Sequence, residues 1–283
     1  MFSIGFILAP LVACVLIVAV NVYFGIHVIK REIIFIDIAL ASIAALGSAV
    51  GMVLFHIQHD DHSGESHGIL PYLFSVAFIS LASAAFSMLK HKKISIPLEA
   101  IIGISYAVAT TLTVIFLDKG AGGDVHVHDM LVGSVLWVSW SQVLRLALIV
   151  LLVGTFHIVF RKKFTRMTDN FQEACNELKS PRVWDFLFYL SFGLVVVEAV
   201  NISGILTVFA FLIIPASLTA FITRGWIPKL LVGWSAGILA SFFGLVFSLK
   251  LDVPSAPVII VLLGVMLILV FIWYKMSHAR NSQ

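Results

Sequence analysis

The sequence has very little charge and almost no cysteine. Only 12% of its 283 residues are Asp, Glu, Lys or Arg, and it holds 2 cysteines. A chain of this length with so few charges does not have the composition of a soluble globular domain. Cys14 falls in an apolar run and Cys175 in a polar connection, so we expect neither a disulfide nor a thiolate metal site.

Two chemical motifs are also missing. The chain has no Gly-x-x-x-x-Gly-Lys-Ser/Thr sequence, the loop that binds phosphates in many nucleotide hydrolases, so we do not expect it to hydrolyse ATP itself. It has no His-Glu-x-x-His sequence, which argues against an intramembrane metalloprotease. Its net charge of +3 comes from short connections and gives no indication of nucleic-acid binding.

Hydrophobic residues are abundant instead. They make up 60% of the chain, and the mean hydropathy is +1.08, more apolar surface than one soluble core can bury. A hydrocarbon layer about 30 Å thick is crossed by about 20 apolar residues. We therefore expect one all-α domain over 1–283, a polytopic helical bundle. Its expected spans lie near 4–28, 33–55, 69–89, 94–117, 131–160, 184–203, 204–222, 228–249 and 256–274.

Two of these spans need a comment. Residues 131–160 are long enough for a span that is tilted or broken. The first span has no basic region before it and no small-residue cleavage site after it, so we expect a retained helix and not a signal peptide.

The basic residues predict the orientation of the chain. Of the 18 Lys and Arg residues, all but Lys119, Arg145 and Lys250 fall in alternate connections or beyond the last span. Cytoplasmic connections carry this excess of positive charge. We therefore expect a multi-pass protein of a bacterial plasma membrane, with the N-terminus outside and the C-terminus in the cytoplasm.

The connections on the expected outer side are rich in metal-ligating residue types. Imidazole and carboxylate suit borderline divalent ions such as zinc, and short spacings let one loop surround an ion. Two alternatives stay open: a solvated polar loop, or a low-affinity collector that raises the local ion concentration. The candidate ligands are His56, His59, Asp60, Asp61, His62, His67, His126 and His128.

The longest inner connection, 161–183, predicts a short amphipathic helix. Asp169 or Asn170 can begin it, and one apolar face follows at helical spacing. About ten residues are too few to span a bilayer, so this face must meet either a soluble partner or lipid headgroups. We favour the partner. The residues assigned to that contact are Asp169, Phe171, Glu173, Ala174 and Leu178.

This helix and the segment after it resemble the zinc- and manganese-type ABC transporter permeases. In residues 204–220, Gly204-Ile205-Leu206 leads into an apolar run that ends Ile214-Pro215-Ala216 with Ser217 and Ala220 close behind, as in that family. Nearly the whole chain matches in order. The other matching segments are 29–31 with 35–37, 133–136, 252–254 and 257–261.

The resemblance implies a type II ABC importer-like fold and a set of partners. These are a separate nucleotide-binding ATPase subunit, an extracytoplasmic metal-binding protein and a second copy of the permease. A divalent transition metal would be the substrate, with no covalently bound cofactor. The inner helix would be the coupling helix through which the ATPase drives alternating access.

Two positions concern the ion pathway. The family commonly has His four residues after the Asp of the second span, whereas this chain has Ala41 after Asp37. Asp37 is therefore the only carried-over member of that site. Glu198 stands where the family more often has an uncharged polar residue, and a charged residue within the membrane is costly, by about 2.5–3.5 kcal/mol at a helix centre. Either ion contact or pairing, for example with Arg145, would explain it.

Small residues in two spans predict close helix packing. The segments 47–51 and 233–237 each place glycines four residues apart, which lets helix backbones approach within or between subunits. Three functions fit the whole pattern. The first is a metal-importing ABC permease, the second a self-contained proton-coupled metal carrier, and the third a metal-dependent membrane enzyme, which lacks a cluster of acid, base and nucleophile.

Overall fold

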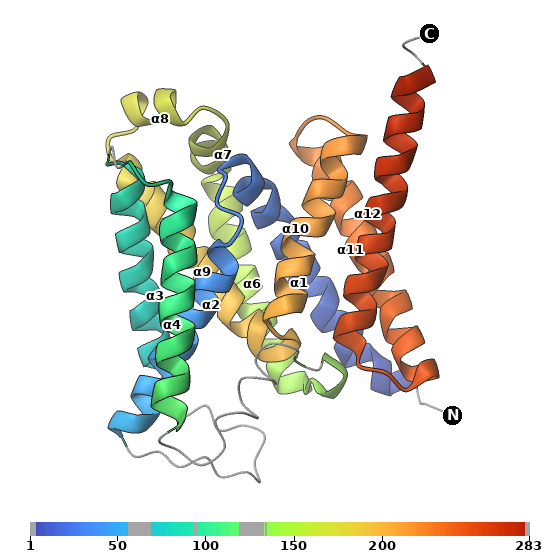
Figure 1. Cartoon of the computed structure of the whole chain (residues 1–283), viewed down its shortest axis with the longest axis horizontal. Helices are drawn as coiled ribbons and strands as arrows, with labels where there is room; N and C mark the ends of the chain where they lie inside the picture. Colours follow the sequence, from blue (N-terminus) through green and yellow to red (C-terminus); the bar gives the residue numbers. More distant parts are fainter. Residues whose placement is uncertain (1–3, 56–68, 93–94, 119–132, 134, 281–283) are drawn as a thin grey trace. The chain divides into compact units, whose positions relative to one another are not determined.

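The computed structural model describes residues 4–55, 69–92, 95–118, 133 and 135–280. This part of the chain is almost entirely helical and contains no strand (Figure 1). The elements are α1 (Ile4–Lys30), α2 (Ile36–Leu54), α3 (Ile69–Lys90), α4 (Leu98–Asp118), η1 (Val135–Trp137), α6 (Trp140–Val159), α7 (Arg161–Asp169), α8 (Phe171–Glu177), α9 (Pro181–Ser203), α10 (Ile205–Ile222), α11 (Trp226–Leu251) and α12 (Ser255–Arg280).

Nine of the described helices are long and apolar enough to cross a membrane. They are α1, α2, α3, α4, α6, α9, α10, α11 and α12. The all-α prediction and the nine expected spans are thus confirmed. Each helix lies within a few residues of its expected span, apart from the segment 131–160.

The segment 131–160 was expected to be either tilted or broken, and it is broken. The short 3₁₀ helix η1 comes first, and α6 begins only at Trp140. The backbone N–H of Ser139 donates to Gln142 Oε1 at 2.8 Å, and the N–H of Gln142 lies 3.3 Å from Ser139 Oγ. This reciprocal arrangement is a capping box, which satisfies N–H groups at a helix start and so fixes where α6 begins.

The helices group into two compact units, each built from separate stretches of the chain. The first unit comprises residues 1–32, 129–156 and 198–283, and the second comprises 33–128 and 157–197. In the first unit α10 contacts α1, α11 and α12, and α11 also contacts α1 and α12. In the second unit α2 packs against both α3 and α4, and α7 contacts α8.

The small residues identified in two spans lie in helix contacts within each unit. In the second unit a Cβ on Gly47 of α2 would lie 2.7 Å from the carbonyl oxygen of Phe74 in α3. In the first unit a Cβ on Gly233 or Gly237 of α11 would lie 2.5 Å from Val22 or Val18 of α1. Close packing within the chain is therefore what these glycines provide.

Two of the segments that resemble the permease family begin at Gly133 and Gly204. They meet in the first unit, where α9 turns into α10. Gly204 separates the two helices with φ 77°, and Gly133 has φ 55°. A Cβ on Gly133 would lie 2.3 Å from the backbone nitrogen of Gly204. Both positions favour glycine, because a left-handed backbone disfavours side chains. The two backbone segments also approach each other too closely for a Cβ on Gly133.

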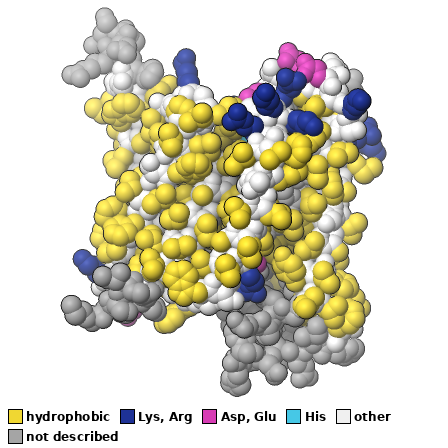
Figure 2. Space-filling model, turned by 180° about the vertical axis from the view of Figure 1, so that it is seen from behind, with side chains coloured by type: hydrophobic (Ala, Val, Ile, Leu, Met, Phe, Trp, Pro, Cys, Tyr) yellow, Lys and Arg dark blue, Asp and Glu magenta, His cyan; other side chains and the backbone are white. Residues whose placement is uncertain are grey.

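The surfaces of the helices are apolar over most of their length. Large exposed hydrophobic side chains occur along α4, α6 and α12, such as Ile104, Leu151 and Leu269. Figure 2 shows this apolar cover, and it shows Lys and Arg gathered at the end of the second unit where α7 and α8 lie. An apolar flank with charge at its end is what a bilayer-spanning surface requires.

Candidate functional site

Asp37 lies in the first turn of α2, within the second unit. Its side chain is buried, and its Oδ1 atom has no hydrogen-bond partner. The backbone N–H groups of Asp37 and Ile38 interact with the carboxylate. A buried carboxylate with an unpartnered oxygen is costly unless a cation or a proton accompanies it. This position is therefore suited to a ligand.

The next turn of α2 offers no second ligand. Ala41 is buried one turn after Asp37 and contributes only a methyl group to that face. Ser42 is also buried, and its Oγ accepts a hydrogen bond from Thr110 Oγ1 of α4 at 3.2 Å. Any further ion ligand beside Asp37 must come from another element or from water.

Glu198 of α9 pairs with Arg145 of α6 inside the first unit. Arg145 Nε lies 3.7 Å from Glu198 Oε1, and the side chains are 49% and 9% exposed. The pairing alternative for Glu198 is therefore observed. Its role as an ion ligand stays a prediction, as does that of Asp37.

The inner connection forms two helices. Residues 171–177 form α8, so the predicted amphipathic helix is present and ends one residue before Leu178. Asn170 precedes it, and Asn170 Nδ2 donates to Glu173 Oε2 at 3.0 Å. The sequence reasoning missed α7, although Phe164, Met167 and Thr168 are spaced as one helix face and are all buried.

The apolar face of α8 contacts the chain itself. The Phe171 ring lies 5.2 Å from the His91 ring, and Lys90 Nζ lies 4.6 Å from the centre of the same ring. Ala174 is buried, whereas Phe171 and Leu178 are half-buried. The exposed residues of this region include Asp169, Gln172, Glu173, Asn176 and Glu177.

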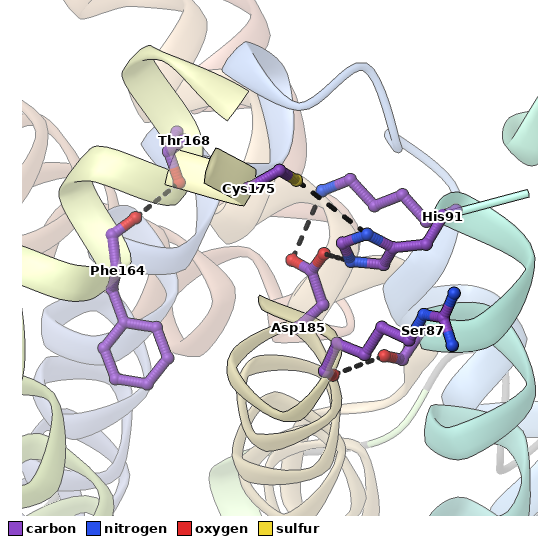
Figure 3. A network of polar contacts seen from close by, with 8 residues as sticks. Ser87, His91, Phe164, Thr168, Cys175 and Asp185 are labelled. Carbon is purple, nitrogen blue, oxygen red and sulfur yellow. Dashed lines mark hydrogen bonds and ion pairs between the residues drawn. The ribbon is translucent and has the colours of Figure 1, made fainter. Parts of the chain in front are cut away.

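A buried carboxylate supports this contact (Figure 3). Asp185, in the first turns of α9, has its Oδ1 3.3 Å from Lys90 Nζ and its Oδ2 2.9 Å from His91 Nε2. Ser87 Oγ donates to the carbonyl oxygen of Arg182 at 2.5 Å, a second link between α3 and α9. We call Lys90, His91 and Asp185 the charged seat of α8.

The thiol of Cys175 lies at the edge of this seat. Its Sγ is 3.9 Å from His91 Nδ1. Burial, and then the negative charge of Asp185, raise the pKa of the Cys175 thiol, while Lys90 lowers it. The sequence analysis named none of the seat residues, although an acid just inside an apolar span is a signal that could have singled out Asp185.

The candidate ligands of the outer connections lie outside the described residues. This applies to the whole set, from His56 to His67 together with His126 and His128. Within the described part of the chain, no three His, Cys, Asp or Glu side chains stand close enough to hold a metal ion.

Comparison with known proteins covers almost the whole chain. The model of the ABC 3 transport family matches residues 3–274. A "probable metal transport system membrane protein" of Chlamydia muridarum is 22% identical over 243 residues, 85% of this chain and 80% of that protein. The "manganese transport system membrane protein MntC" of Listeria innocua is 24% identical over 222 residues, 74% of this chain and 78% of that protein.

The fold also has a solved counterpart. A structure described as PsaBC from Streptococcus pneumoniae in complex with Fab aligns with a TM-score of 0.78 and 17% identity. The alignment covers 95% of this chain and 92% of that one.

Proposed function

The chain belongs to the ABC 3 transport family, and from this membership we propose that it is the membrane-spanning permease subunit of an importer for a divalent transition metal ion. The observation that carries the proposal is the match over residues 3–274, which includes all nine spanning helices almost completely. The names of the relatives, a metal transport protein and a manganese transport protein, support a metal as the cargo.

ATP hydrolysis is assigned to a separate subunit, because the chain lacks a phosphate-binding loop. The assembly that we propose pairs two copies of the permease with two ATPase subunits and an extracytoplasmic metal-binding protein. Its place is the bacterial plasma membrane. The basic residues around α7 and α8 support a cytoplasmic position for this end, which puts the N-terminus outside and the C-terminus inside.

In the alternating-access mechanism that we propose, Asp37 contacts the ion during transfer. Its unpartnered buried oxygen is a hard ligand, which suits manganese-like ions better than zinc unless an imidazole joins it. ATP binding draws the two ATPase subunits together, and α8 passes that movement to the spans. The exposed residues Asp169 and Glu173 supply the outer face of this contact, while Phe171, Ala174 and Leu178 hold α8 to the permease.

A reconstitution experiment tests the proposal. The chain is expressed with its proposed ATPase subunit, placed in liposomes and supplied with manganese, zinc or iron in the presence of the proposed binding protein. We expect uptake that needs ATP and stops when the catalytic carboxylate of the ATPase is neutralised. Uptake by the chain alone, driven by a proton gradient, would establish the carrier alternative instead.

A further inference from the structure

The charged seat joins α9 to the end of α3 through one carboxylate. Asp185 comes from α9, whereas Lys90 and His91 come from the end of α3 and the residue after it. Both carboxylate oxygens are engaged, one with Lys90 Nζ at 3.3 Å and one with His91 Nε2 at 2.9 Å. The Asp185 side chain is 0% exposed. Bulk solvent therefore does not compete with Lys90 and His91 for its oxygens. The carboxylate holds the two basic groups in fixed orientations.

Phe171 contacts the same two groups. Its ring contacts Lys90 Nζ as a cation–π pair at 4.6 Å and the His91 ring at 5.2 Å. The first residue of α8 thus contacts two side chains that Asp185 of α9 binds. A cation over an aromatic face is attracted only within a narrow range of positions, so the orientation of Lys90 matters for this contact.

We propose that Asp185 is a positioning residue for energy coupling, which holds Lys90 and His91 as the seat of Phe171 so that a push on α8 moves α3 and α9 together. The proposal rests on the proposed function, because α8 must receive its push from the ATPase. The seat itself belongs to the isolated chain. The two ideas can therefore fail separately.

The first experiment tests whether the charged seat stays closed in the purified chain, without the ATPase. Cys175 is half-buried and lies 3.9 Å from His91, so opening of the seat should increase access to its thiol. We measure the rate of maleimide addition to Cys175 in the purified chain, by mass spectrometry of the peptide, as a function of pH. Neutralising Asp185 also removes a charge that raises the pKa of this thiol, which speeds the reaction at low pH regardless of access. When the rate is divided by the fraction of the thiol that is ionised at each pH, it gives a plateau rate that reports access alone.

We expect Asp185→Asn to raise this plateau rate by about threefold or more. Glu99→Gln is the matched control, since it removes one negative charge from the first turn of α4 in the same unit without touching the seat. An unchanged plateau in Asp185→Asn would overturn the proposal, whatever the complex with the ATPase does.

The second experiment reads coupling in the full complex. We expect Asp185→Asn to lower the number of metal ions transported per ATP hydrolysed by about threefold or more, while the ATPase still copurifies. A residue needed only for stability would lower yield, transport and hydrolysis together and leave their ratio unchanged. That result would also overturn the proposal.

A second variant covers the case in which Asp185→Asn does not fold. Removing one partner of a buried ion pair leaves the other charge uncompensated, whereas removing both does not. Asp185→Asn with Lys90→Met is therefore expected to restore the yield but not the transport ratio, because Phe171 still lacks its cation. Restoration of both would show that the seat serves stability only. Failure of the wild-type complex to move metal would instead refute the proposed function.

Discussion

At the residue scale, the ion pathway that we propose depends on one buried carboxylate, Asp37. We expect Asp37→Ala to lower transport of every divalent ion tested, by about tenfold or more, since loss of a group that supports a metal site commonly has effects of this size. Ser42→Ala is a control on the same helix, because Ser42 is also buried. Initial uptake rates in proteoliposomes give the comparison. Normal rates and metal preference in Asp37→Ala would reduce Asp37 to a packing residue.

The position one turn later tests metal preference. Four residues advance a helix by about 6 Å and keep the same face, so Ala41→His would place an imidazole beside Asp37. Because zinc prefers nitrogen ligands, we expect this variant to retain more zinc in the purified permease and to release it more slowly. Zinc content is measured after dialysis. Ala41→Leu controls for the added bulk at a buried position, and equal zinc in both variants would contradict the prediction.

Arg145 and Glu198 form the one pairing that the sequence alternatives anticipated. We expect Arg145→Met to lower the thermal stability of the purified permease, since it leaves Glu198 as an unpaired charge with a side chain only 9% exposed. Adding Glu198→Gln should restore the melting temperature. If the restored double variant transports metal normally, Glu198 is a structural residue. If its transport stays low, Glu198 also contacts the ion.

Residue identities suggested this pair as one of two alternatives, because a membrane-embedded acid needs either a partner or an ion. They did not give the charged seat. Lys90, His91 and Asp185 are separated by up to 95 residues, and their meeting depends on how α3 packs beside α9. Side-chain spacing along one helix carries no information about such a contact.

At the scale of elements, we propose that the two faces of α8 have different tasks. We expect Glu173→Arg, on the exposed face, to reduce copurification of the ATPase by reversing a charge in the proposed contact. Phe171→Ala should leave copurification intact and lower transport per ATP, because its ring lies against Lys90 and His91. Glu99→Arg on α4 is the control for charge reversal. Equal behaviour of the Glu173 and Phe171 variants would mean that one face serves both tasks.

The outer connection between α2 and α3 gives a second prediction for an element. We propose that it collects scarce metal without forming part of the pathway. Replacing His56, His59, His62 and His67 by Gln together should then slow uptake at limiting metal and have little effect at saturating metal. Complete loss of transport at saturating metal, with normal protein levels, would place the connection in the pathway itself.

Element boundaries followed from the sequence where a chemical signal marked them. The span lengths gave nine helices, and the candidate first residues Asp169 and Asn170 marked the start of α8, although Asn170 makes no side-chain capping hydrogen bond there. Ser139 and Gln142 also marked the start of α6. This signal was overlooked because apolar residues continue on both sides of it. The direction of the apolar face of α8 could not be derived, because a helix face that avoids water fits a partner, a lipid surface or its own chain equally well.

At the scale of the whole molecule, apolar length and the distribution of basic residues sufficed for the class of fold. The order in which helices touch did not follow from either property. It depends on local shape, such as the notches at Gly233 and Gly237 that receive Val22 and Val18. Glycine pairs four residues apart indicate that another helix backbone approaches closely, but they do not show which helix it is.

These notches limit how the first unit can deform. Val18 and Val22 are one turn apart on α1 and fit glycines one turn apart on α11, each with room for no additional carbon. Sliding α11 along α1 would lift each valine out of its notch and press it against a larger side chain. We therefore expect a shear between the two helices to be unfavourable, so that α1 and α11 move together as one rigid body.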